Sequence, residues 1–296
     1  MPAKIIDGKK IAEEIKQEVK GETERLKAER GIAPGLAFIL VGDNPASQVY
    51  VKMKGKGCEE VGFYSVTEIL SAETSEAHLL KLLDQFNRDP KIHGILVQLP
   101  LPKHISEEHV LITIDYRKDV DGFHPVNVGR LVTGQHCLKP CTPLGVQELL
   151  VRSGNDPGGK HVVVVGRSNI VGKPVMNILL QKQKGANAVV TIAHTGAKDL
   201  SRFTKQADIL IAAMGKAECI RGDMIRPGAI VIDVGINRVD DASAKNGYRI
   251  VGDVHFTSAV QVAGAITPVP GGVGPMTIAM LLKNTLRAAQ GGIYND

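Results

Sequence analysis

The residues with the clearest chemical potential form a glycine-rich turn in the second half of the 296-residue chain. Residues 161–174 read His-Val-Val-Val-Val-Gly-Arg-Ser-Asn-Ile-Val-Gly-Lys-Pro. The four valines are typical of a strand buried on both faces, and residues 173–180 have helix-compatible apolar spacing, with Pro174 tolerated in the first turn. A strand, a glycine turn and a helix in succession direct a helix N-terminus toward a phosphate. The stretch therefore indicates a dinucleotide-binding turn.

Three other interpretations of this turn are weighed against dinucleotide binding. A Walker P-loop requires four residues between its glycines, whereas five separate Gly166 from Gly172, and proline follows the lysine. A nucleophile elbow requires glycine two residues after Ser168, where the chain has Ile170. Both are excluded. An ordinary tight turn stays open, because the match to G-x-G-x-x-G is imperfect.

A second set of candidate residues lies in the first half of the chain. Tyr50 and Lys54 are four residues apart in a helix predicted from about Ala46 to Val61, so they share one face. The alternative for Lys54 is a solvated lysine, the usual state of this residue type. Gln98 closes an apolar strand predicted at 93–100, where its amide needs partners or faces the ligand crevice at the carboxyl end of a parallel sheet.

The loop 118–125 gathers two acids and a histidine: Asp119, Asp121 and His124. These residue types are compatible with a metal site, but no further cluster lies nearby in the sequence. A turn or a contact with the substrate is therefore favoured, and no metal is expected.

A glycine- and proline-rich segment, 267–277, contains Pro270 and Gly271. Such a segment exposes backbone groups with little side-chain obstruction, which suits the close approach of a flat ligand. The alternative is a simple connector between two elements.

Elements that would position these residues alternate between strand and helix in both halves. Expected helices span 9–30, 75–87 (with Ser75 as a capping residue), 144–153 and 276–289, and expected strands span 35–42, 65–70, 188–193, 207–213 and 229–235. This alternation predicts an α/β protein with a doubly wound parallel sheet in the second half. The two prolines of 140–143 predict a stiff domain junction, and the closing helix is expected to return to the first domain.

The type of dinucleotide is indicated by the end of the second strand after position 160. A site that prefers NAD usually has an acid there, about 20 residues after the glycine turn, whereas the chain has Ala193-His194-Thr195. Arg167 and Thr195 can donate hydrogen bonds to a 2′-phosphate, so NADP is favoured. His194 is open to a second interpretation, as a capping residue.

Composition narrows the possible partners. The net charge is +5 and the isoelectric point is about 8.9, yet the basic residues form no run of five or more, which argues against nucleic acid. The chain has no signal peptide and no long apolar run, so no membrane association is expected. The four cysteines form no C-x-x-C pair and are interpreted as reduced thiols in a cytoplasmic protein.

Several of these segments together resemble the bifunctional methylenetetrahydrofolate dehydrogenase/methenyltetrahydrofolate cyclohydrolase family. The matching segments occur in the family's order and include 41–47, 50–54, 97–102, 118–125, 140–143, 166–174 and 267–277. The set extends over nearly the whole chain, which makes the resemblance highly specific.

The resemblance implies two α/β domains with an active-site cleft between them. A folate-binding catalytic domain would comprise residues 1–143, joined by the C-terminal helix 275–296, and a Rossmann-like NADP-binding domain would comprise 144–274. It also implies a homodimer that acts on tetrahydrofolate one-carbon derivatives, with products that serve one-carbon metabolism and purine biosynthesis.

The roles of site residues are likewise implied by the resemblance. Tyr50 would stack on the folate, Lys54 would be the central catalytic group, and Gln98 would hydrogen-bond to it. Asp121 would hold the pterin ring. The cofactor contacts would come from Gly166, Arg167, Ser168, Thr191 and Ile232, to which the reasoning above adds Thr195, with Pro270 and Gly271 as substrate contacts.

The implied chemistry has two steps. The first removes a hydride from 5,10-methylenetetrahydrofolate, which requires mainly alignment with the nicotinamide. The second hydrolyses the methenyl cation to 10-formyltetrahydrofolate and needs proton transfer at a positioned group. A lysine has an ordinary pKa of ~10.4, so Lys54 must be shifted downward by burial or by the positive substrate to act as a base.

The chain departs from the family's pattern at one place. The family often reads Cys-His-Ser-x-Thr after the second Rossmann strand, whereas Ala197 removes the later hydroxyl here.

The sequence also bears on alternative functions. A short-chain dehydrogenase is excluded, because its Tyr-x-x-x-Lys pair follows the glycine turn, whereas Tyr50 and Lys54 precede it. A glutamate- or malate-type dehydrogenase and a catalytically silent folate-binding protein remain the alternatives.

Overall fold

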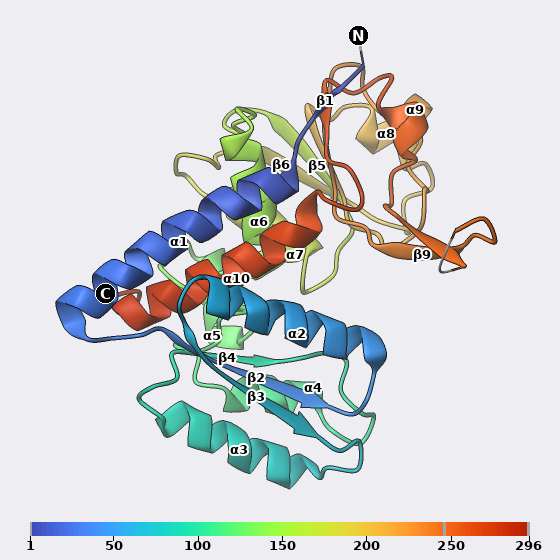
Figure 1. Cartoon of the computed structure of the whole chain (residues 1–296). Coiled ribbons are helices and arrows are strands. Elements are labelled where there is room, and N and C mark those ends of the chain that lie inside the picture. Colours follow the sequence, from blue (N-terminus) through green and yellow to red (C-terminus); the bar gives the residue numbers. More distant parts are fainter. Residues whose placement is uncertain (1, 245–246, 295–296) are drawn as a thin grey trace. The chain divides into compact units, whose positions relative to one another are not determined.

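Figure 1 shows the computed structural model, which describes residues 2–244 and 247–294. Two compact units divide the chain. Among the described residues, unit 1 contains 2–12 and 142–277, and unit 2 contains 13–141 and 278–294. The helices α1 (Gly8–Arg30) and α10 (Val273–Gln290) each begin in unit 1 and continue in unit 2.

The expected division of the chain into a folate-binding domain and an NADP-binding domain stays a prediction. The structure adds that residues 2–12 group with the second half of the chain. Residues 1, 295 and 296, at the ends of the expected spans, lie outside the described residues.

Unit 1 contains a six-stranded parallel sheet, which confirms the predicted α/β class. Its order is β1 (Lys4–Ile5), β11 (Ala265–Ile266), β8 (Ile230–Asp233), β7 (Ile209–Ala212), β5 (His161–Val165), β6 (Val189–Ala193). The strands β1 and β11 were not predicted, because two residues are too short to show a periodicity.

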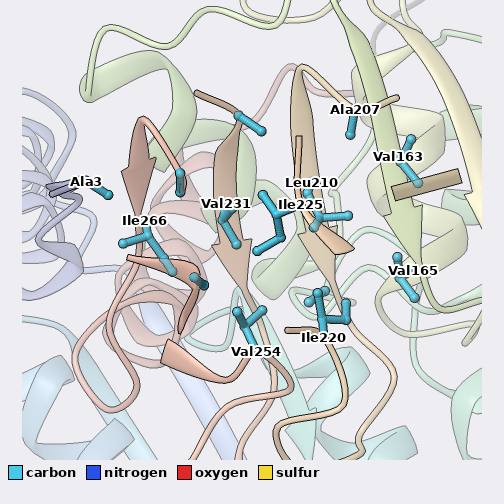
Figure 2. Close-up of a cluster of buried hydrophobic side chains, with 14 of the residues drawn as sticks. Ala3, Val163, Val165, Ala207, Leu210, Ile220, Ile225, Val231, Val254 and Ile266 are labelled. Atoms are coloured by element: carbon cyan, nitrogen blue, oxygen red, sulfur yellow. The ribbon is translucent and has the colours of Figure 1, made fainter. Parts of the chain in front are cut away.

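The valine run of β5 lies inside this sheet, between β7 and the edge strand β6, as its composition predicts. All four valines have no exposed surface, and their neighbours on β6 and β7 are in parallel register. Figure 2 shows one face of the core, where Val163 and Val165 lie with Leu210, Val231 and Ile266 from the adjoining strands. Burial on both faces explains why the run is uninterrupted.

Helices and a hairpin complete unit 1: α6 (Cys141–Arg152, whose first residue groups with unit 2), α7 (Gly172–Leu179), α8 (Ser201–Thr204), the 3₁₀ turn η1 (Gly222–Met224), α9 (Phe256–Ala259), and the antiparallel strands β9 (Asn237–Asp240) and β10 (Tyr248–Val251). The boundary between the two units falls after Cys141, inside the predicted junction at 140–143. The helix start expected at about 144 was wrong, since α6 already begins at Cys141. Pro143 therefore lies in the first turn, where a missing N–H costs the helix nothing. No helix in the described part of the chain is both long and apolar enough to cross a bilayer.

Unit 2 has a three-stranded parallel sheet in the order β3 (Tyr64–Leu70), β2 (Gly35–Val41), β4 (Gly94–Val97). In Figure 1 the helices α2 (Pro45–Glu60) and α3 (Glu76–Arg88) lie on opposite faces of it. The central strand β2 is buried throughout, and α3 packs Leu79, Leu83 and Phe86 against it. As predicted, Ser75 caps α3, because its Oγ accepts the His78 N–H at 3.3 Å.

Two short helices follow β4 in unit 2, α4 (Glu107–Thr113) and α5 (Pro125–Val132). The segment between them runs parallel to β4, since Ile95 forms a bridge with Asp119 and donates its N–H to Lys118 O at 2.8 Å. In that register, Asp121 lies beside the carboxyl end of β4, where Gln98 follows. The sheet thus brings two separately predicted site residues to one place.

Candidate functional site

The first group of site residues gathers around Lys54 in unit 2. Lys54 is half-buried, and its Nζ donates to Gln98 Oε1 at 3.0 Å. Gln98 Nε2 donates to the carbonyl of Leu99 at 2.8 Å, so the amide oxygen is left to face the lysine. Tyr50 lies one turn earlier on α2 with 44% of its surface exposed. The interpretation of Lys54 as an ordinary solvated lysine is therefore wrong.

Asp121 adds a carboxyl group near this lysine. Burial raises the pKa of Asp121, while the positive charge of Lys54 and the nearby Cys141 thiol act in the opposite direction. The Cys141 Sγ itself donates to the Val120 carbonyl at 3.2 Å. Burial also raises the pKa of Cys141 well above its usual range, so the thiol stays protonated and can donate. Sequence reasoning assigned Cys141 only to a junction, since the sequence does not show that it faces Asp121.

The other polar residues of the 118–125 loop have structural roles. Asp119 is 2% exposed and accepts hydrogen bonds from the backbone N–H groups of Gly122 and His124. His124 Nδ1 in turn accepts the Val126 N–H at 3.1 Å and caps α5. The turn interpretation is thus confirmed for Asp119 and His124. No group of three or more metal-ligating side chains occurs among the residues that the structure describes.

The glycine turn of unit 1 joins β5 to α7. Gly166 has φ +137°, and a Cβ there would overlap the Ala213 carbonyl. A Cβ on Gly172 would overlap the Gly166 carbonyl, so both glycines are needed for the close approach of strand and helix. Ser168 Oγ accepts the N–H groups of Val171 at 3.1 Å and of Gly172 at 3.3 Å. These bonds cap the helix, while residues 167–170 remain exposed.

The surroundings of this turn fit a phosphate-bearing dinucleotide. Arg167 is exposed and has no side-chain partner in the described part of the chain. Because Val165 pairs with Ala193, the exposed Thr195 follows the neighbouring strand end. His194 Nδ1 accepts the Gly196 N–H at 3.0 Å and so closes a turn; the next helix, α8, begins only at Ser201, so His194 does not cap a helix. The next acid, Asp199, is engaged by the backbone N–H that opens α8.

The remaining predicted contacts are less accessible. Thr191 lies within β6, where its hydroxyl is 2.9 Å from His161 Nε2. Ile232 has no exposed surface. Pro270 and Gly271 follow β11 in a loop, with Gly271 at φ +107°. The structure therefore brings Gly166, Ser168 and the exposed Arg167 and Thr195 to adjoining strand ends, but not the side chains of Thr191 and Ile232.

Two buried carboxylates that sequence reasoning missed hold the loops at the carboxyl ends of β7 and β8. Asp233 is 3% exposed and accepts the N–H groups of Gly235, Asp253 and Val254. Asp253 is fully buried and accepts the N–H groups of residues 214–216. Burial raises the pKa of Asp233 to about 7 despite these donors.

Comparison with known proteins assigns both halves of the chain. Residues 6–121 match the family model for the tetrahydrofolate dehydrogenase/cyclohydrolase catalytic domain, and residues 140–292 match that for the NAD(P)-binding domain. The bifunctional protein FolD of Moorella thermoacetica is 63% identical over 290 residues, which cover 98% of this chain and all of that protein.

Solved structures show the same similarity. The bifunctional FolD enzyme of Campylobacter jejuni has a TM-score of 0.91 at 49% identity, covering 97% of this chain and 99% of that chain. The methylenetetrahydrofolate dehydrogenase-cyclohydrolase of Trypanosoma brucei, complexed with NADP cofactor and inhibitor, has a TM-score of 0.91 at 40% identity, covering 98% of both chains.

The raised pKa of Asp233 predicts a pH-dependent contribution to stability. Its folded-state pKa of about 7 exceeds the unfolded value of about 3.9, so its stabilising contribution is complete below pH ~4 and is lost as the pH rises to about 7. We therefore expect the unfolding free energy of the wild type, relative to Asp233→Asn, to fall across this interval and then level off. Urea denaturation of both proteins from pH 4 to 8 measures the difference, and a difference that rises with pH would contradict the prediction.

Proposed function

The chain belongs to the tetrahydrofolate dehydrogenase/cyclohydrolase family, and we propose the following roles for its residues in catalysis and binding. The enzyme oxidises 5,10-methylenetetrahydrofolate to 5,10-methenyltetrahydrofolate with NADP and hydrolyses the product to 10-formyltetrahydrofolate, in one-carbon metabolism. The observation that carries the residue assignment is the hydrogen bond of 3.0 Å between Lys54 and Gln98, with the carboxyl group of Asp121 near the same lysine.

We assign substrate binding to Tyr50, Asp121 and the Lys54–Gln98 pair. The exposed ring of Tyr50 offers a face for stacking on the flat pterin. The pterin presents adjacent N–H groups, and a carboxylate can accept two such donors at once. Asp121 supplies that acceptor, and its partial burial strengthens the bonds because less water competes. The backbone of Pro270 and Gly271 is assigned a further substrate contact.

The dehydrogenase step requires alignment more than proton transfer. NADP, when bound, accepts the hydride that leaves the one-carbon bridge. The chain contributes a turn that Gly166 leaves without a side chain, the hydroxyl of Ser168, and the guanidinium of Arg167, which is free to pair with the 2′-phosphate. Thr195 lies at the neighbouring strand end and supplies a second donor, while Thr191 and Ile232 stay as proposed lesser contacts.

The cyclohydrolase step requires a base for the attacking water. Water adds to the methenyl carbon, and its proton must leave before the ring opens to the 10-formyl product. Lys54 in its neutral form accepts that proton, and the Gln98 oxygen fixes the direction of its nitrogen.

The assembly and location are also proposals. We assign a homodimer formed through β3, because this strand is at the open edge of the unit 2 sheet and exposes Tyr64 and Ile69, the latter by 64%. A cytoplasmic location is supported by the four cysteines, which are all free. The 10-formyl product would then serve purine biosynthesis.

Replacing Lys54 tests the catalytic assignment. We expect Lys54→Met to reduce hydrolysis of 5,10-methenyltetrahydrofolate by ~10²-fold or more, because the base is lost, and to leave NADP affinity unchanged. Lys52→Met, an exposed lysine on the same helix, is the matched control and should retain full activity. Absorbance of the methenyl substrate follows the reaction. Normal hydrolysis by Lys54→Met would remove this residue from its role.

Replacing Arg167 tests the recognition of the 2′-phosphate. We expect Arg167→Ala to raise KM for NADP by ~10- to 100-fold through the loss of a charge-assisted bond, while the weak activity with NAD barely changes. Arg221→Ala, another exposed arginine of unit 1, should change neither value. NADPH and NADH absorbance report both. If KM rises equally for the two dinucleotides, Arg167 does not contact the phosphate.

The assembly is tested at the exposed edge of β3. We expect the wild type to have the mass of a dimer and Ile69→Lys to have that of a monomer, since a charge would be buried in the pairing of two edges. Ile112→Lys, at a comparably exposed position on α4, should stay dimeric. Light scattering after size-exclusion chromatography gives the masses, and a monomeric wild type would refute the assignment.

A further inference from the structure

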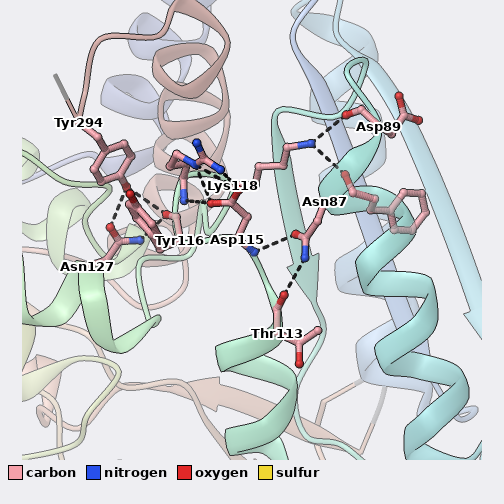
Figure 3. A network of polar contacts seen from close by, with 10 residues as sticks. Asn87, Asp89, Thr113, Asp115, Tyr116, Lys118, Asn127 and Tyr294 are labelled. Carbon is pink, nitrogen blue, oxygen red and sulfur yellow. Dashed lines mark hydrogen bonds and ion pairs between the residues drawn. The ribbon is translucent and has the colours of Figure 1, made fainter.

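A tyrosine beyond the last helix is docked deep in unit 2. The Tyr294 hydroxyl lies 2.7 Å from Asn127 Oδ1 and 3.1 Å from Tyr116 O (Figure 3). It also accepts the Leu138 N–H at 3.3 Å. Its ring meets that of Tyr116 edge-on, with centroids 5.0 Å apart, and Arg130 lies over it. Burial raises the pKa of Tyr294, so the hydroxyl keeps the proton that it donates.

This proton sets the orientation of a buried amide. Asn127 has no exposed surface, and its Nδ2 donates to Tyr116 O at 2.8 Å and to Asp119 Oδ2 at 2.9 Å. Its Oδ1 accepts from Tyr294, so every polar position of the side chain is used. A reversed amide would place its oxygen against the Asp119 carboxylate, which is strongly unfavourable in a buried site.

Asp119 holds the turn that carries Asp121 through hydrogen bonds to its backbone. Its two oxygens accept the N–H groups of Gly122 at 3.1 Å and of His124 at 2.8 Å, the first and third residues after Asp121 in the chain. Gly122 has φ +72°, and a Cβ there would crowd Pro140, so the turn has little freedom to shift. The position of the Asp121 carboxyl therefore depends on Asp119, and that of Asp119 on Asn127.

We propose that Tyr294 is a positioning residue for the folate site, acting through Asn127 and Asp119 on Asp121. This rests on the proposed role of Asp121 in holding the pterin. Tyr294 is 167 residues from Asn127 in the chain, and its hydroxyl bonds to Asn127, Tyr116 and Leu138 rather than to Asp121. Its hydroxyl affects folate affinity and leaves the NADP turn of unit 1 unaffected.

The test compares Tyr294→Phe with the wild type in the full-length enzyme. We expect KM for 5,10-methylenetetrahydrofolate to rise by about tenfold, because a buried acceptor loses its donor, while KM for NADP changes by less than about twofold. Tyr116→Phe is the matched control, since its hydroxyl makes no hydrogen bond among the described residues and its ring contact is kept. It should leave both constants unchanged.

A double-mutant cycle separates positioning from general stability. On an Asp121→Asn background, Tyr294→Phe should have no further effect on the folate KM, because the group that it positions is gone. An equal effect on both backgrounds, or none on the wild type, would overturn the positioning role and leave the proposed function standing. If Asp121→Asn alone leaves the folate KM unchanged, the role of Asp121 fails and this inference fails with it.

A second variant, Asn127→Asp, keeps the proposal testable if Tyr294→Phe folds poorly. Asn127→Asp breaks the same link from the other side, since its carboxylate would face that of Asp119. We expect the same loss of folate affinity, together with faster hydrogen exchange at the N–H groups of Gly122 and His124. Unchanged exchange at both positions would overturn the proposal.

Discussion

A carboxylate can be buried only where hydrogen-bond donors replace the water that it loses, and this constraint shapes both units. In unit 2, Asp119 collects two backbone N–H groups and the amide of Asn127, and it closes the turn that holds Asp121. In unit 1, Asp233 and Asp253 collect backbone N–H groups from the loops beyond β7, β8 and β10. These acids fix the conformation of the loops, while other residues are proposed to carry out the chemistry.

The parallel strands bring the proposed site residues together at one edge of each sheet. Because the carboxyl ends of parallel strands meet at one edge, Gln98 and Asp121 arrive together from segments that are 23 positions apart. The same geometry places the Gly166 turn beside Thr195 in unit 1. Lys54 reaches Gln98 from a helix that packs on the sheet, so its nitrogen is held by an amide that is itself held by Leu99. The proposed base is therefore prearranged.

The strands and helices with strong periodicity were predicted to within a few residues, and the weak elements were not. The valine run of β5 and the capped helix α3 carry their own signals in composition and spacing. The strands β1 and β11 carry none, since each is stabilised only by pairing within the sheet. The start of α6 was misplaced because the two prolines around Cys141 indicate a break as well as a first turn.

The sequence by itself determined the class of the fold, the glycine turn with its preference for NADP, and the four residues proposed for the folate chemistry. The fold class and the glycine turn follow from local patterns, whereas the folate roles of the four residues follow from the resemblance to the family. Only the tertiary structure decided that Lys54 is hydrogen-bonded, that Asp119 is a turn former rather than a ligand, that Cys141 lies near Asp121, and that Tyr294 is hydrogen-bonded to Asn127. Burial and side-chain hydrogen bonds depend on which segments meet in space, and they leave no periodic signal in a single sequence.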